Sequence, residues 1–462
     1  MRELALVIAG VGAKPRFGLA TVLSQEALAG WVGRGPSQTP PAYTVSSSGA
    51  RLPPLFLGSL ALPALTHALP RPAYTYSSSM PISRRHFFLG SLALPAFAAK
   101  KPPARPNLLL FLVDDLPAWA LGCYGNKEIR TPNIDRLSQT GTHFLNHFVC
   151  TPAAGPSRAT FLTGRTPMQT GAATSLDKIL GDLGYEIHTE DASAASGFIG
   201  RQTAAKQFFL TVTSSKLSAP YDGVAQKYRD LYAKATFEGY VPDPVSANAR
   251  AGKEMLTDIV GNVRKFAAAL SELDDQVAAA LAAINQKGLL DNTLIVFSST
   301  CGSLLGRHGL WDSGDASDPV NMYDEAVGTP MIWSWAGRVP ALATQVELVS
   351  SYDFAPTVCN ALGTPPPGGL CGRSYLLMAT GKPLPKKQRW RSTVCGHYQN
   401  TDMAREEHYK VVLRDGGKGP NEFYDLNSDP REKVNQTDND QYVSIKTSLS
   451  AEIAKWKQQY SG

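Results

Sequence analysis

The sequence predicts an α/β fold: a large, mixed but mostly parallel sheet sandwiched by helices, with a smaller C-terminal α+β portion. Residues 107–113 (NLLLFLV) form one apolar run, short enough for a strand buried on both faces of a parallel sheet. Residues 293–297 (TLIVF) have the same character. Between them, residues 262–287 carry apolar side chains at helical spacing, and Gly288 follows the predicted helix end. A helix followed by a buried strand is typical of α/β proteins.

The chain changes character after residue 340. A rigid loop, residues 365–369 (PPPGG), is followed by short segments such as 409–413 (YKVVL) and by a predicted helix at 442–458. We therefore predict a main α/β domain at residues 100–340 and a smaller α+β subdomain at residues 341–462.

The formal net charge of +6 comes entirely from the start of the chain. Residues 1–99 contain eight Lys or Arg and two Asp or Glu, whereas the rest contains 37 of each sign. A neutral body has no electrostatic footprint for nucleic acid, so we expect no such partner. No apolar run in the mature part is long enough to span a bilayer, so we expect no transmembrane anchor. Six cysteines are too few for a disulfide scaffold, and their spacing leaves any pairing open.

The first hundred residues contain an export signal of the twin-arginine kind. Residues 83–89 (SRRHFFL) precede an apolar stretch and an A-x-A cleavage pattern at 96–99. We therefore predict a signal peptide at residues 80–99, with Met80 as the natural start, and a bacterial-type protein exported to the periplasm or beyond. The sequence FLGSLALPA occurs at both 56–64 and 88–96. This duplication suggests that residues 1–79 are a disordered, non-native upstream extension.

Several short motifs occur in one order along the body of the chain, and together they resemble the sulfatase family of the alkaline-phosphatase superfamily. The resemblance covers about residues 105–460 and implies the fold predicted above. Its motifs are 106–115 (PNLLLFLVDD), 122–125 (GCYG), 131–137 (TPNIDRL), 141–144 (GTHF), 156–165 (PSRATFLTGR), 291–297 (DNTLIVF), 306–311 (GRHGLW), 416–426 (GGKGPNEFYDL) and 428–432 (SDPRE).

The resemblance implies a particular chemistry. Sulfatases cleave sulfate esters with a hydrated formylglycine, made from Cys (sometimes Ser) in a C-x-P-S-R stretch. A calcium ion, held by several oxygen ligands, polarises the ester as a Lewis acid. Basic side chains neutralise the departing anion and protonate the leaving group. By resemblance, Asp114 and Asp115 occupy metal positions, Arg158 follows the signature and faces the pocket, and His308 either lines the pocket or packs in its loop.

The chain departs from the family at the nucleophile. Two residues before 156–158 (PSR), the position is Ala154, whose methyl group is neither oxidised to formylglycine nor nucleophilic. An alternative alignment uses Cys150 as the modified residue and treats residues 153–156 as an insertion. The simpler interpretation of Cys150 is a buried thiol. Thr151 is the only candidate nucleophile for a phosphate- or phosphonate-ester hydrolase.

The second metal segment also departs from the family, which has Ser-Asp-His/Asn-Gly where residues 299–302 here are STCG. Thr300 and Cys301 replace a carboxylate and an imidazole or amide, so Asp114 and Asp115 lose their expected partners. Two carboxylates are a poor calcium cage, and we expect calcium binding to be doubtful.

Other basic residues of the family are missing. A family Lys is replaced by Ser313 and a family Arg by Gly328. The segment before 208–210 is too short for the family's Lys and His, and we expect His188 and Lys206 to lie on the solvated surface. The next loop has Ala219-Pro220-Tyr221 where the family has Pro-His.

Three hypotheses follow from these observations. The chain is an active hydrolase of sulfated carbohydrates or aryl sulfates with altered machinery, or a catalytically impaired relative that binds a small anionic ligand or a partner, or a decaying or misassembled reading frame. Loss of a nucleophile together with metal ligands removes most of the rate enhancement of an enzyme. The sequence therefore favours an impaired pseudoenzyme.

Overall fold

A computed structural model of the chain describes residues 105–169 and 173–461. The predicted extension and signal peptide lie outside the described residues. The helices are α1 (Pro132–Gln139), α2 (Ala154–Thr163), α3 (Leu176–Asp182), α4 (Ala192–Gly200), α5 (Gln226–Tyr232), α6 (Ile259–Gln286), α7 (Asp324–Val327), α8 (Phe354–Ala361), α9 (Leu376–Ala379) and α10 (Val443–Tyr460).

The central sheet has seven strands in the order β4-β5-β1-β6-β7-β2-β8. The strands β4, β5, β1 and β6 are parallel to one another, β7 is antiparallel to both β6 and β2, and β8 is parallel to β2. Mixed, mostly parallel pairing confirms the predicted fold class. Its strands are β1 (Asn107–Val113), β2 (Thr142–Phe144), β4 (Glu186–Asp191), β5 (Phe208–Thr213), β6 (Thr293–Ser299), β7 (Met331–Ser334) and β8 (Ala343–Gln345).

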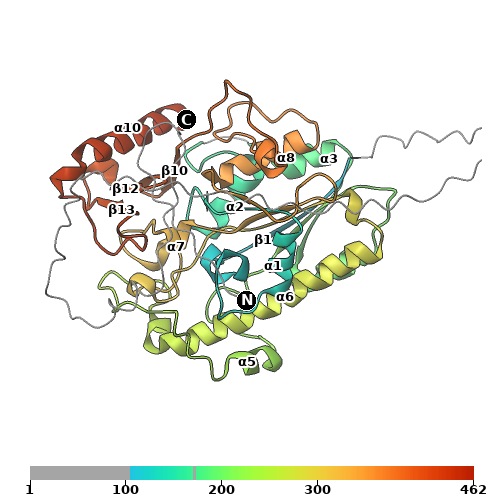
Figure 1. The fold of residues 1–462 in the computed structure, drawn as a ribbon, viewed down its shortest axis with the longest axis horizontal. Coiled ribbons are helices and arrows are strands. Elements are labelled where there is room, and N and C mark those ends of the chain that lie inside the picture. Colours follow the sequence, from blue (N-terminus) through green and yellow to red (C-terminus); the bar gives the residue numbers. More distant parts are fainter. Residues whose placement is uncertain (1–104, 170–172, 462) are drawn as a thin grey trace, which may run out of the picture. The chain divides into compact units, whose positions relative to one another are not determined.

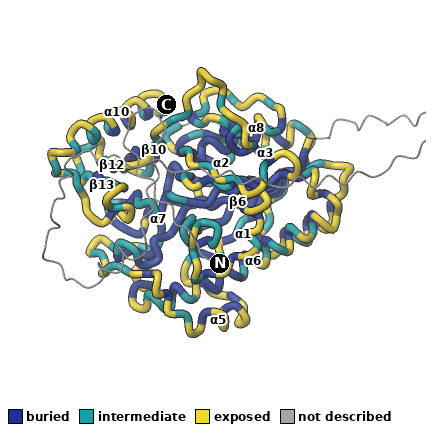
Figure 2. Tube along the Cα trace, viewed as in Figure 1, coloured by how far each residue is buried: buried dark blue, intermediate teal, exposed yellow. Residues whose placement is uncertain are grey.

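Helices cover both faces of this sheet (Figure 1). On one face α1, α4 and α5 pack against the long helix α6, while α2, α3 and α8 cover the other face. Side chains of β1 at odd-numbered positions enter the core beneath α6, and those at even-numbered positions enter the opposite core. Because each face of β1 needs apolar side chains, the strand reads as one continuous apolar run. Figure 2 shows the strands of the central sheet as the most buried part of the described chain.

A second, antiparallel sheet follows in the C-terminal part. Its order is β10-β11-β12-β13, and α10 packs on it through Leu449, Ile453 and Trp456. The strands are β10 (Thr393–Tyr398), β11 (Thr401–Glu406), β12 (Tyr409–Arg414) and β13 (Glu422–Asp425), and a separate parallel pair joins β3 (His147–Phe148) to β9 (Val349–Ser350). The small α+β portion is as predicted, although β8, which lies beyond residue 340, belongs to the main sheet. The boundary at 340/341 stays a prediction.

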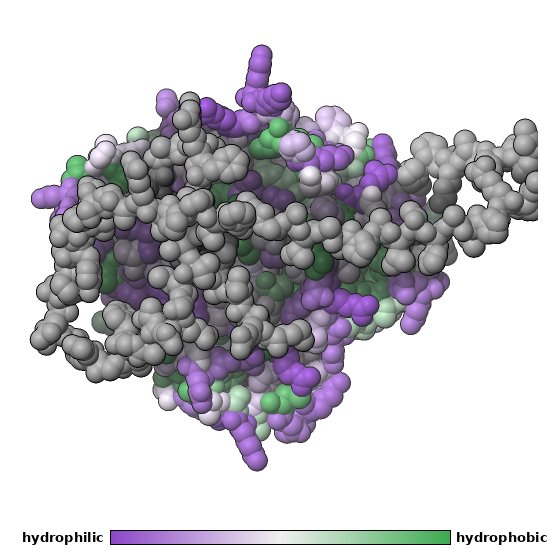
Figure 3. Space-filling view, viewed as in Figure 1, coloured by the Kyte–Doolittle hydropathy of each residue, from purple (hydrophilic) through white to green (hydrophobic). Residues whose placement is uncertain are grey.

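The visible outline of the described surface is mainly hydrophilic, with small apolar patches (Figure 3). Among the helices of residues 105–169 and 173–461, none is both long and apolar enough to cross a membrane.

Candidate functional site

The candidate site lies where β1 and β6 end. The two strands are parallel, with Val113 paired to Ser299, so the residues that follow them emerge at the same edge of the sheet. The Thr300 N–H donates to the Val113 carbonyl at 2.8 Å. Asp114 is tied in the same way to the end of β5, through a 3.0 Å bond from its N–H to the Ser214 carbonyl. The backbone therefore brings together the two segments that the sequence paired.

Asp114 carries two hydrogen bonds on one oxygen atom. Arg158 Nη2 lies 2.7 Å from Asp114 Oδ1, and Thr300 Oγ1 donates to that atom at 2.6 Å. Arg158 extends from α2 and also donates from Nη1 to the Leu112 carbonyl at 3.3 Å. Side-chain exposures of 27% for Arg158 and 17% for Asp114 make this a partly buried ion pair, which water screens less than an exposed one.

Asp115 is held by two different donors. Cys301 Sγ donates to Oδ1 at 3.1 Å, and the Ser218 hydroxyl donates to Oδ2. Burial raises the pKa of Asp115 to about 6, and the nearby Asp312 carboxylate adds to this rise, while the two hydrogen bonds oppose it. The residue has a left-handed backbone with φ of 57°, a conformation uncommon outside glycine and frequent at functional sites.

The Cys301 thiol is a hydrogen-bond donor to Asp115. Burial raises the pKa of Cys301 well above its usual value, and the Asp115 carboxylate raises it further. A protonated thiol donates a weak hydrogen bond, whereas coordination of a metal by sulfur requires the thiolate.

The residues present do not fit a calcium cage. Calcium takes six to eight oxygen ligands, but Thr300 and Cys301 direct their hydrogens at the two carboxylates instead of offering charged oxygens. Three of the four carboxylate-bound hydrogens come from neutral groups, and the fourth comes from Arg158. Within residues 105–169 and 173–461, no group of three or more His, Cys, Asp or Glu side chains could hold a metal ion.

Ala154 is the first residue of α2, four positions before Arg158. The chain enters this helix from Ala153 in an extended conformation, with φ of −150°. The Cys150 side chain is fully buried, as the simpler interpretation expects, and packs with Tyr352 in a core cluster of the C-terminal part. Burial raises the pKa of Cys150 well above its usual value.

The candidate nucleophile Thr151 is engaged in a hydrogen bond to the backbone. Its side chain is fully buried, and the hydroxyl donates to the His397 carbonyl at 2.8 Å.

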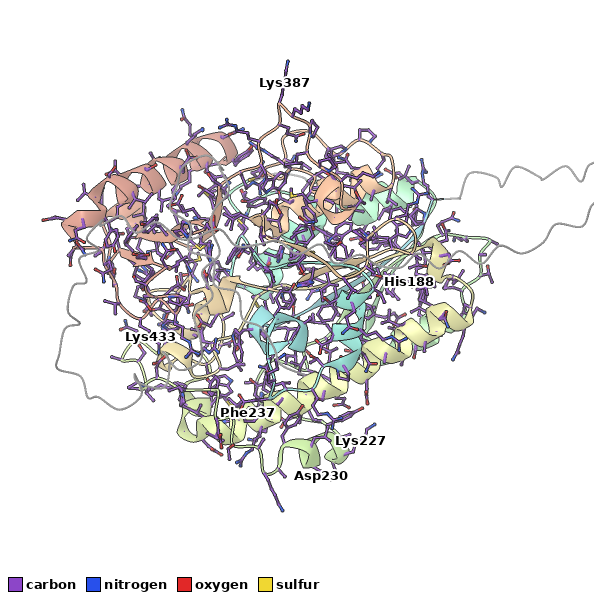
Figure 4. The ribbon with its side chains drawn as sticks, viewed as in Figure 1. His188, Lys227, Asp230, Phe237, Lys387 and Lys433 are labelled. Atoms are coloured by element: carbon purple, nitrogen blue, oxygen red, sulfur yellow. The ribbon has the colours of Figure 1, made fainter. Side chains whose placement is uncertain are left out.

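His308 belongs to a different cluster. Its ring stacks on Tyr323 at 3.7 Å, and Nε2 lies 3.3 Å from Glu325 Oε2. It lines a pocket of about 370 Å³ together with Tyr323 and Lys433, which is labelled in Figure 4. Its described hydrogen bonds reach neither Asp114 nor Asp115.

The substituted position Gly328 and the two residues expected on the surface, His188 and Lys206, make local contacts only with their own surroundings. An added Cβ at Gly328 would lie 2.6 Å from the Asp324 carbonyl oxygen, so the backbone there has no room for the family's Arg. His188 is 40% exposed on the edge strand β4, beside Glu186 and far from Lys433 in Figure 4. Lys206 is 62% exposed and lies 3.9 Å from Glu186.

Two site residues escaped the sequence reasoning. Ser218 is separated from Asp115 by 103 positions, in a loop after β5 where the family pattern is lost. Asp312 follows Trp311 and lies close enough to Asp115 to raise its pKa. Neither belongs to a motif, and only a signal linking distant positions could have found them.

Comparison with known proteins places the chain in a class of folds and in a family. The chain has the fold of the alkaline-phosphatase superfamily. Residues 106–190 and 191–364, more than half of the chain, match the family described as Sulfatase, and residues 306–459 match N-sulphoglucosamine sulphohydrolase, C-terminal. The chain belongs to the sulfatase family.

Its similarity to individual relatives is low but extensive. It is 22% identical to an ulvan-active sulfatase of Formosa agariphila over 76% of this chain and 80% of that protein. A protein solved in complex with its substrate, D-glucosamine-2-N,6-O-disulfate, has a TM-score of 0.65 at 19% identity, covering 77% of this chain and 98% of that one. The phosphonate monoester hydrolase of Agrobacterium radiobacter has a TM-score of 0.65 at 18% identity, with 77% and 96% covered. These likenesses establish the fold.

Proposed function

We propose that this chain is an exported sulfatase-family protein that has lost turnover of sulfate esters while keeping the surrounding fold. The observation that carries the proposal is Ala154. The methyl group stands at the start of α2, four residues before Arg158, where the family sequence places its nucleophile. Loss of a nucleophile alone typically costs several orders of magnitude in rate.

The remaining site residues support the same proposal. A family calcium ion, when bound, would polarise the ester and stabilise its departing charge. Here Thr300 and Cys301 use their hydrogens on Asp114 and Asp115, and Arg158 is engaged with Asp114. In these contacts Thr300 and Cys301 are hydrogen-bond donors, and we derive no catalytic step for them.

The ligand class that we propose is a small sulfated carbohydrate or another anionic ester. Of the similar proteins named above, one is an ulvan-active sulfatase and another was solved with a disulfated glucosamine as its substrate. Export by the twin-arginine route, with residues 80–99 as the signal, would place the protein in the periplasm or outside the cell. The neutral body gives no electrostatic support for a nucleic-acid partner.

An aryl-sulfate assay tests the proposal. We expect the wild type to give no turnover above a boiled sample. The variant Ala154→Cys/Thr300→Asp/Cys301→His, expressed with a formylglycine-generating enzyme, restores a C-x-P-S-R stretch and two metal positions, and we expect measurable turnover. Ala159→Cys, an exposed position on the same helix, is the matched control and should stay inactive.

Turnover by the wild type well above the boiled sample would overturn the proposal. Aryl phosphate and phosphonate esters belong in the same assay, because one solved structure of this fold is a phosphonate monoester hydrolase. Sequencing of the underlying DNA addresses the third hypothesis, since a corrected codon at 154, 300 or 301 would show a misassembled frame.

A further inference from the structure

We infer that Arg158 provides, from within the fold, the positive charge that Asp114 requires, while neutral donors hold Asp115, so that the two carboxylates are stable without a bound cation. The inference rests on the proposed loss of sulfatase chemistry and names what replaced the metal. The sequence resemblance implies that Arg158 faces the pocket, whereas in the structure it holds Asp114 in position.

The guanidinium group is fixed on both sides. Arg158 Nη2 lies 2.7 Å from Asp114 Oδ1, while Nη1 donates to the Leu112 carbonyl at 3.3 Å. Both acceptors belong to the end of β1, so one side chain from α2 closes the strand end. Two anchoring contacts on a planar group leave Arg158 little freedom to follow a ligand.

Three neutral donors complete the arrangement. The Thr300 hydroxyl donates at 2.6 Å to Asp114 Oδ1, the same oxygen that Arg158 contacts. On Asp115, the Cys301 thiol donates a hydrogen bond to Oδ1 and the Ser218 hydroxyl donates one to Oδ2. A bound cation needs lone pairs at these places, and a carboxylate without a cation needs donors. Hydroxyl and thiol groups at positions 300 and 301 match the second requirement.

The charge on Arg158 therefore stabilises the fold. Side-chain exposures of 27% and 17% in this pair contrast with 66% and 63% in the pair Lys178–Asp182, which has a comparable 2.6 Å distance. An exposed pair contributes little to stability, whereas breaking a partly buried pair leaves an uncompensated carboxylate. Lys178–Asp182 is thus a matched control within the same chain.

Thermal unfolding of the full chain tests the inference. We expect the same Tm for wild type in EDTA and in about 5 mM calcium chloride. Arg158→Met should lower Tm by roughly 5 °C, and Asp114→Asn should lower it as well. The double variant should lose less than the sum of the two, because each single change strands a charge that the double removes. Lys178→Met should shift Tm by no more than about 1 °C.

Additive losses in Arg158→Met and Asp114→Asn, or a rise of more than about 2 °C in wild-type Tm with calcium, would overturn the inference. If Arg158→Met does not fold, Arg158→Lys keeps the charge, and a Tm between wild type and Asp114→Asn would support the same conclusion. Failure here is distinct from failure of the proposed function. If calcium stabilises a chain that shows no turnover, the inference about Arg158 fails and the proposed function stands. If the chain shows turnover and calcium does not change its Tm, the proposed function fails and the role of Arg158 stands.

Discussion

Lys410 is the residue whose removal should damage this fold most clearly. Its side chain is fully buried in β12, where Nζ lies 2.8 Å from Asp324 Oδ1 and 2.7 Å from Glu432 Oε1. Arg405 also reaches Asp324, at 3.1 Å. The cluster joins the C-terminal sheet to α7, which follows the loop of the main domain that carries His308. Substitution of Lys410 by Met keeps most of the stem volume but leaves two buried carboxylates with one cation.

The expected cost follows from this geometry. Breaking a buried pair by removing one partner typically costs about 3 to 5 kcal/mol, because an uncompensated charge stays inside. Burial raises the pKa of Glu432, so without Lys410 this carboxyl can take up a proton and avoid part of the cost. We therefore expect Lys410→Met to lower the free energy of unfolding by about 3 kcal/mol.

Urea unfolding, followed by circular dichroism and by intrinsic fluorescence, measures this loss. Lys178→Met is the control, because its ion pair is exposed on both sides, at 66% and 63%, and should contribute less than about 1 kcal/mol. A loss in Lys410→Met no larger than that of the control would refute the reasoning, because the cluster would then contribute no more to stability than an exposed ion pair.

Three further predictions address other parts of the molecule. Asp115→Asn should remove a pH dependence: its folded-state pKa of about 6 lies above the ordinary 3.8, so wild-type stability should rise by about 1 kcal/mol from pH 7 to pH 5 relative to the variant, as urea midpoints would show. Arg391→Lys should cost about 2 kcal/mol in the same unfolding assay, since it loses one of two contacts to the buried Asp353 carboxylate. Gly328→Ala should lower Tm by several degrees, and an unchanged Tm would show that the Asp324 carbonyl can move.

Much of the fold follows from patterns that lie within single segments. The apolar runs at 107–113 and 293–297 became β1 and β6, because strands buried on both faces need such runs. The predicted helix 262–287 is α6, which starts at Ile259 after Asp258 caps it by accepting the Gly261 N–H. That cap was overlooked because it precedes the apolar periodicity.

The candidate site could be predicted only in part. Asp114 and Thr300 meet because parallel strands end at one edge, a rule that needs no coordinates. The contact between Arg158 and Asp114 was not predicted, since the resemblance implied only that Arg158 faces the pocket. Ser218, which contributes to the same cluster, depends on a contact across 103 positions. Such a contact leaves no trace in local periodicity, and neither does the contact of His308 with Glu325.

The position of β1 in the middle of the sheet has a consequence for biosynthesis. Its two partners are β5 and β6, and the pairing of Asn107 with Thr293 spans 186 positions. In a chain emerging from the ribosome in order, both edges of β1 are open until β5 has been made, and one edge stays open until β6 follows. Contacts of such long range are slow to form. During that interval the apolar strand presents open edges, so synthesis rate and chaperone supply should govern the yield of soluble protein.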